Sequence, residues 1–250
     1  MIIKYLRLIH AFIEAFWILW VQFPHFSRER KLQEIQSWSQ RTLDVLGIEV
    51  KRSASDHFGP ENHSALLLVA NHISWVDCLI IQTLQPSVFI AKAEVAHWPV
   101  IGSIAKACGV IFVERSTPSS VRTMVNAASS ALHQGYCVAG FPEGTSTEGH
   151  HVNTFHANLF EAAIAHHAQV MPIALRYSEA NSGRLSTAAA FVGDIGFATS
   201  LHQIITAPRI QVSVQVGQPL SPIGHSRKSL AHLSHRSVMS QLENLSALPT

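Results

Sequence analysis

Short apolar runs alternate with longer segments in which apolar residues recur at helical spacing. The apolar runs predict strands over residues 48–52, 65–70, 88–91, 110–114, 136–140, 170–175, 188–192 and 210–216. The helical spacing predicts helices over residues 78–84, 99–107, 118–133, 157–167, 195–205 and 227–245. Pro118 follows Ser116 and Thr117, either of which suits a helix cap. Strands and helices that alternate in this way indicate an α/β fold, with a largely parallel sheet flanked by helices.

Two helices are predicted ahead of the first strand. Residues 2–23 are strongly apolar but are interrupted by four polar residues, which share one face of a helix at about 100° per residue: Lys4, Arg7, His10 and Glu14. Apolar side chains occupy the rest of the surface, among them Ile3, Phe12, Ile13, Phe16, Leu19 and Trp20. A second amphipathic helix is predicted over residues 28–46, with Gly47 placed to end it.

The N-terminal segment has three possible structural roles. Residues 22–25 do not resemble the small-residue cleavage site of a signal peptide, and the charges make a spanning helix a poor fit. The pattern favours a helix that lies in the membrane interface. A helix packed in a soluble core and a tilted span with snorkelling charges are the alternatives. We therefore divide the chain into an N-terminal amphipathic two-helix membrane-docking motif, residues 1–47, and a catalytic domain, residues 48–250.

Composition narrows the class of protein. Hydrophobic residues make up 47% of the 250 residues and charged residues 14%, against roughly 25% charged in an average soluble domain. The mean hydropathy of +0.18 is too high for a disordered chain and too low for a polytopic transporter. A formal net charge of +2 is not the basic excess of a nucleic-acid-binding domain. The three cysteines are isolated in apolar segments, which indicates reduced thiols in the cytosol.

Polar residues follow three of the predicted strands. Residues 71–77 come directly after the strand 65–70, Arg115 follows the strand 110–114, and residues 141–145 follow the strand 136–140. Ligands of parallel α/β sheets bind beyond the carboxyl ends of the strands, so these three segments are expected to converge at one edge.

His72 and Asp77 form a candidate base and its orienting carboxylate. They are five positions apart, which on one continuous helix would place them about 140° from each other. If His72 lies in the turn and Asp77 in the first turn of the following helix, the carboxylate reaches one imidazole nitrogen and leaves the other free to act as a base. Taken alone, the spacing favours a histidine that caps the start of the helix.

Four sequence blocks resemble those of the glycerolipid acyltransferases typified by bacterial 1-acyl-sn-glycerol-3-phosphate (lysophosphatidic acid) acyltransferase. They are residues 71–77, which match a His-x4-Asp motif, residues 109–115, which match Gly-x-x-Phe-x-x-Arg, residues 141–145 (Phe-Pro-Glu-Gly-Thr) and residues 170–174 (Val-Met-Pro-Ile-Ala). Lys92 and Glu94 also match the stretch between the first two blocks. Four blocks in order are far more specific than any one of them.

The resemblance implies an acyltransferase of phospholipid biosynthesis. It would move a fatty acyl chain from acyl-CoA or acyl carrier protein to the free hydroxyl of 1-acyl-sn-glycerol-3-phosphate, giving phosphatidic acid. His72 would be the general base, and Asp77 would orient it. The resemblance implies no cofactor and no metal. Acyl-CoA or acyl carrier protein would serve as a co-substrate. It would reside on the cytoplasmic face of the inner membrane as a peripheral or monotopic protein, with a membrane lysophospholipid as its substrate.

The resemblance also assigns the acceptor-binding residues, with two departures. It places the lysolipid acceptor at Lys92, Arg115, Glu143, Gly144 and Thr145. Members that form phosphatidic acid usually carry arginine where this chain has Ser146, and Pro-Phe-Lys where it has residues 154–156 (Thr-Phe-His). The loss of two cations keeps open an acyltransferase that acts on another lysolipid, such as lyso-ornithine lipid.

Three other functions are weaker fits to the sequence. A metal site at the histidine-rich stretch 150–167 lacks accompanying ligands at suitable spacing. A lysophospholipase would need a serine nucleophile, and no Gly-x-Ser-x-Gly elbow is present. A non-catalytic lipid-binding protein would have no use for a paired base and orienting carboxylate.

Overall fold

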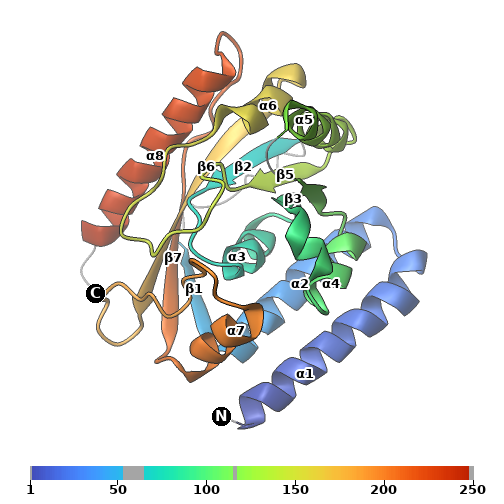
Figure 1. Ribbon diagram of the computed structural model, residues 1–250, viewed down its shortest axis with the longest axis vertical. Helices are drawn as coiled ribbons and strands as arrows, with labels where there is room; N and C mark the ends of the chain where they lie inside the picture. The colour runs from blue at the N-terminus through green and yellow to red at the C-terminus, as the bar shows by residue number, and fades with distance from the viewer. Residues whose placement is uncertain (1, 53–64, 115–116, 248–250) are drawn as a thin grey trace.

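The computed structural model describes residues 2–52, 65–114 and 117–247. In these residues seven strands form one sheet in the order β1-β7-β6-β2-β5-β3-β4 (Figure 1). The strands are β1 (Ile48–Arg52), β2 (Leu66–Ala70), β3 (Ser87–Lys92), β4 (Ile111–Val113), β5 (Cys137–Gly140), β6 (Gln169–Glu179) and β7 (Ile210–Val216). Neighbouring strands are parallel except for β6 and β7, which are antiparallel. The predicted α/β fold with a largely parallel sheet is confirmed.

Helices cover both faces of the sheet. They are α1 (Ile2–Trp17), α2 (Arg28–Leu46), α3 (Val76–Leu84), α4 (Ile101–Ala107), α5 (Pro118–His133), α6 (Phe160–Ala165), α7 (Phe197–Thr206) and α8 (Arg227–Ala247). Side chains of α2, α3 and α7 share one core with the sheet, and those of α5, α6 and α8 share the other (Figure 1). The central strand β2 is buried on both faces, which explains its unbroken apolar run.

Local sequence signals account for several element ends. Gly47 ends α2 with a φ of +78°, in the left-handed region where glycine has no steric penalty. Thr117 caps α5 by accepting a hydrogen bond from the Ser120 N–H, and Pro118 occupies the first turn. The alternative cap, Ser116, lies outside the described residues.

The strand predicted over residues 188–192 is wrong. The Ala190 N–H donates to the Thr187 carbonyl, which makes a turn, and the Phe191 N–H donates to the Ile73 carbonyl. Ala189 is fully buried in the core. An apolar loop that packs into the core and a buried strand have the same short apolar pattern, so periodicity does not separate them.

The N-terminal helix α1 packs against α2 on one side and is open on the other. Its inner side buries Leu8, Ala11 and Ala15, and the Trp38 indole N–H donates to the Ala11 carbonyl over 2.9 Å. Its outer side carries large apolar side chains that are all more than half exposed: Ile2, Ile3, Leu6, Ile9 and Ile13, with Trp17 at its end and Trp20 just beyond. The apolar surface is therefore unpartnered over the full length of the helix.

Two of the interrupting charges of α1 are explained by its neighbours. The Lys4 ammonium donates to the carbonyl of Ile205 near the end of α7, and Glu14 pairs with Arg41 of α2 at 3.1 Å. Phe12, which the sequence placed with the outward apolar residues, instead packs against Trp38. In the described part of the chain, no helix combines the length and hydropathy that crossing a membrane requires.

Candidate active site

The turn between β2 and α3 brings His72 and Asp77 together. β2 ends at Ala70 and α3 begins at Val76, so His72 lies in the turn and Asp77 in the first helical turn. His72 Nδ1 lies 2.9 Å from Asp77 Oδ2. The imidazole side chain is 23% exposed, whereas the carboxylate is fully buried. The carboxylate therefore fixes one ring nitrogen and leaves Nε2 available for chemistry.

The Asp77 carboxylate is surrounded by hydrogen-bond donors. Oδ2 also accepts from the backbone N–H groups of Ile73 at 2.7 Å and Ser74 at 2.9 Å. Oδ1 accepts from the hydroxyl of Tyr177 at 2.6 Å. A buried carboxylate is costly without such partners, so these bonds stabilise the charge that the imidazole faces.

The segment after β5 holds His72 from the other side. The Phe141 ring stacks on the imidazole with centroids 4.1 Å apart and an interplanar angle of 9°. The His72 N–H donates to Glu143 Oε1 at 2.6 Å, and the His72 carbonyl accepts from the Thr147 N–H at 2.8 Å. β2 and β5 are neighbours in the sheet, which is why these two segments meet at its edge.

Glu143 is a link between two backbone segments. Its second oxygen, Oε2, accepts from the Asn153 N–H at 2.7 Å, so both oxygens are bound to amides. Burial raises the pKa of the Glu143 carboxyl, while the amide hydrogen bonds and the nearby His72 oppose that shift. The side chain is buried yet lines the cavity beside His72.

Gly144 is required by backbone geometry and by space. Its φ is +71°, and a Cβ atom there would lie 3.3 Å from Cδ2 of His156. A side chain at this position would therefore be strained and would push against the His156 ring.

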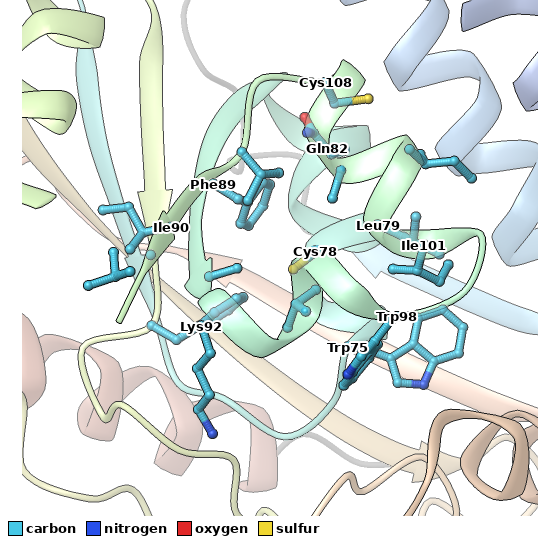
Figure 2. A pocket seen from close by; sticks show the side chains of 18 of the residues that line it. Trp75, Cys78, Leu79, Gln82, Phe89, Ile90, Lys92, Trp98, Ile101 and Cys108 are labelled. Carbon is cyan, nitrogen blue, oxygen red and sulfur yellow. The ribbon is translucent and has the colours of Figure 1, made fainter. Parts of the chain in front are cut away.

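A large apolar cavity of about 1030 Å³ opens beside His72. Its wall is built from α1, α2, α3, β3 and α4, with the polar residues of the turn after β5 next to His72. Figure 2 shows lining residues from α3 (Cys78, Leu79 and Gln82) and from α4 and its end (Ile101 and Cys108), and the Lys92 side chain extends away from the labelled apolar residues. The volume is at the upper end of the range of roughly 300–1,000 Å³ typical of ligand pockets. A long apolar group and a reactive polar group can thus be held together.

Comparison with known proteins decides the family. An acyltransferase family model matches residues 45–176. The chain belongs to the acyltransferase family. It is 34% identical over 188 residues to the 1-acyl-sn-glycerol-3-phosphate acyltransferase of Neisseria meningitidis, which covers 75% of this chain and 71% of that protein. It is 32% identical over 201 residues to the lyso-ornithine lipid O-acyltransferase of Pseudomonas aeruginosa, which covers 80% of this chain and 75% of that protein.

A solved structure shares the fold of this acyltransferase. The crystal structure of the 1-acyl-sn-glycerophosphate acyltransferase PlsC from Thermotoga maritima superposes with a TM-score of 0.69 at 20% sequence identity. The match covers 100% of this chain and 98% of that chain. The architecture of the helices and the sheet is therefore common to both proteins.

The structure brings together most of the site residues that the sequence predicted. Lys92 at the end of β3, Gly144 and Thr145 line the same cavity as His72 and Glu143. Arg115 lies outside the described residues. Ser146 also lines the cavity, but its hydroxyl donates to the Phe191 carbonyl, so the position of the usual arginine is occupied by a neutral, internally bonded group.

The cavity thiols of the acyltransferase are poor nucleophiles. Cys78 and Cys108 line the cavity. Burial raises the pKa of the Cys78 thiol above its usual range and that of Cys108 to about 12. Both thiols stay protonated at neutral pH, so neither offers the thiolate that a covalent acyl-cysteine would need. Within the described ranges, no group of three or more metal-binding side chains could hold an ion.

Two residues of the site were missed in the sequence. Phe141 lies inside a recognised block, yet nothing in that block predicts a ring stacked on His72. Tyr177 lies beyond the strand predicted over residues 170–175, because Arg176 breaks the apolar run. Ile173, Leu175 and Tyr177 alternate along the chain and share one core, and this alternation is the sequence signal that would have predicted a longer strand.

Proposed function

We propose that this acyltransferase moves a fatty acyl chain from acyl-CoA or acyl carrier protein to the free hydroxyl of a lysolipid, with His72 as general base. The observation that carries the proposal is the hydrogen bond between His72 and a fully buried Asp77 beside an apolar cavity. The cavity suits an acyl chain, and the imidazole suits a hydroxyl that must lose its proton.

The reaction needs one base and no covalent enzyme intermediate. His72 Nε2 takes the proton of the lysolipid hydroxyl as its oxygen attacks the thioester carbonyl. The carbon–sulfur bond of the resulting tetrahedral intermediate then breaks, and the imidazolium returns the proton to the departing thiolate. Asp77 stabilises the imidazolium while it exists, and its fixed position keeps Nε2 directed at the substrate.

The first candidate acceptor is 1-acyl-sn-glycerol-3-phosphate, with phosphatidic acid as the product. We propose that Lys92, Arg115, Gly144 and Thr145 bind its headgroup, with Glu143 forming the wall beside His72. The name of the Neisseria relative and the cation at Lys92 support this acceptor.

The second candidate acceptor is lyso-ornithine lipid, and it is favoured by Ser146. The Ser146 hydroxyl donates to the Phe191 carbonyl and supplies no positive charge to a phosphate group. The name of the Pseudomonas relative supports the same alternative. An ornithine headgroup carries one carboxylate and one ammonium, so it needs fewer cations than a phosphomonoester.

Release of free thiol from the acyl donor tests the two acceptors. The full-length protein is incubated with acyl-CoA or acyl carrier protein thioester, together with either lysolipid, and the His72→Ala variant is the control. We expect His72-dependent thiol release with 1-acyl-sn-glycerol-3-phosphate. Release with lyso-ornithine lipid alone would transfer the assignment to the second acceptor. Fatty acid freed from the lysolipid without thiol release would identify a lysophospholipase and contradict acyl transfer.

We also propose that residues 1–47 dock the catalytic domain, residues 48–250, on the cytoplasmic face of the inner membrane. The exposed apolar side of α1 supports this role, because monomeric proteins rarely expose a continuous apolar strip of this kind to water. Trp17 and Trp20 are suited to the headgroup depth of a bilayer. Three unpaired cysteine thiols suit the reducing cytoplasm.

Charge placed on this side of α1 should weaken membrane binding. Ile9 and Ile13 are 55% and 62% exposed, so replacing both by aspartate leaves the core intact. We expect binding of the full chain to vesicles of phosphatidylcholine and phosphatidylglycerol to weaken at least about tenfold, because two apolar anchors are lost. Co-sedimentation measures the bound fraction. Ile223→Asp, at a 74% exposed position before α8, is the matched control. Equal binding by all three proteins would contradict docking through α1.

A further inference from the structure

The strand β6 extends beyond the end of its parallel neighbour β2 and contacts the segment that carries His72 and Asp77. In the pairing of β2 with β6, Ala70 lies opposite Ile173 at the end of β2. The Asn71 side chain then continues the pairing, because its amide donates to the Leu175 carbonyl at 2.9 Å and accepts from the Leu175 N–H at 2.8 Å. Two residues further, Tyr177 lies on the same face of β6 as Leu175, in the core that contains α3.

The Tyr177 hydroxyl reaches the oxygen of Asp77 that His72 does not use. It donates to Oδ1 at 2.6 Å, whereas His72 and two backbone amides surround Oδ2. Tyr177 is fully buried and does not line the cavity. Burial and the charge of Asp77 raise the pKa of the Tyr177 hydroxyl well above its ordinary value. The hydroxyl therefore keeps its proton and always acts as the donor.

We propose that Tyr177 is a positioning residue for acyl transfer, which acts by holding the Asp77 carboxylate in line with His72. The inference rests on the proposed role of His72 as general base. When the imidazole takes a proton, a charged carboxylate must face it. Without the hydroxyl, Oδ1 would be a buried oxygen that has lost this donor, and the carboxylate would turn out of line with His72. Tyr177 does not line the cavity, so we expect its loss to lower kcat and to leave KM unchanged.

The substitution Tyr177→Phe removes this hydroxyl and keeps the ring. We expect kcat to fall about tenfold to a hundredfold, which is the range for a hydrogen bond to a charged group, with the KM of both substrates unchanged. Tyr136→Phe is the matched control, because Tyr136 is a partly buried tyrosine whose ring lies under the Arg28 guanidinium at 3.7 Å, away from the site. Its kcat should equal that of the unmodified enzyme. Rates are divided by the folded fraction, measured by near-ultraviolet circular dichroism, so partial unfolding does not imitate the effect.

A double-mutant cycle with Asp77→Asn separates positioning from packing. If Tyr177 acts through the charge of Asp77, Tyr177→Phe should change kcat less than about twofold in the Asp77→Asn background. A radiolabelled acyl donor makes the low rates measurable. Equal losses in both backgrounds, or a raised KM, would overturn the proposal. The His72→Ala variant is assayed in parallel. Full activity in that variant would refute the proposed general base itself, whereas its inactivity together with an unchanged kcat in Tyr177→Phe would refute only the role of Tyr177.

Discussion

Replacing His72 by alanine is expected to lower kcat about 10²–10⁴-fold, the usual contribution of a positioned general base. The imidazole is bonded to Asp77 at one nitrogen and borders the cavity, so the substitution removes the Nε2 that takes the hydroxyl proton in the proposed mechanism. The KM of the acyl donor should change little, because most of the cavity wall is apolar and remote from the ring. Thiol release under saturating donor and acceptor measures kcat.

The control for this variant is His133→Ala. His133 is an exposed histidine at the end of α5 and does not line the cavity. It should keep full activity. The His72 ring is partly exposed, so its removal should leave the melting temperature within a few degrees of that of the unmodified protein. Turnover that survives the loss of His72 would remove it as the base.

Asp77→Asn is expected to lower kcat by a similar factor of about 10²–10⁴ while leaving the fold in place. The amide oxygen can still accept from the backbone N–H groups of Ile73 and Ser74, and the amide nitrogen can face the Tyr177 hydroxyl. The shape of the site is therefore kept, and the lost quantity is the negative charge that stabilises the imidazolium. Assays with each substrate varied in turn give kcat and KM separately.

The control for the charge is Asp44→Asn, because Asp44 lies on the exposed part of α2, where it accepts a hydrogen bond from Gln40. That variant should be indistinguishable from the unmodified enzyme. A normal kcat in Asp77→Asn would mean that Asp77 serves only to hold the turn before α3, through the Ile73 and Ser74 amides. A lowered kcat together with a strongly lowered melting temperature would instead point to a collapsed turn.

Much of the fold could be predicted from local patterns. The helix starting at Pro118 and the helix ending before Gly47 have strong local signals, and the structure places both ends where the sequence did. The strand predicted over residues 188–192 was wrong because this apolar segment forms a loop that bonds to the turn carrying His72. The outward side of α1 was predicted in part, since the position of Phe12 depends on Trp38, a residue in another helix.

The candidate site was predictable to the extent that its residues lie in short sequence blocks. The contact between His72 and Asp77 spans one turn, so the spacing already limits its geometry. The contact between His72 and Glu143 joins the segments that follow β2 and β5, and the meeting of those segments was expected because neighbouring parallel strands end at one edge. The use of both Glu143 oxygens by backbone amides follows from no local rule, because Asn153 lies in a separate segment.

Local patterns in the chain were enough to predict the alternation of strands and helices, the turn that pairs His72 with Asp77, and the blocks that indicate an acyltransferase. These features depend on the spacing of residues within one element, and spacing is written in the chain. The stacking of Phe141 on His72 and the hydrogen bond from Tyr177 to Asp77, in contrast, depend on how distant segments pack. Tyr177 is 100 positions from Asp77, and a contact between distant residues is set by the register of strands and the packing of helices, which no local pattern encodes.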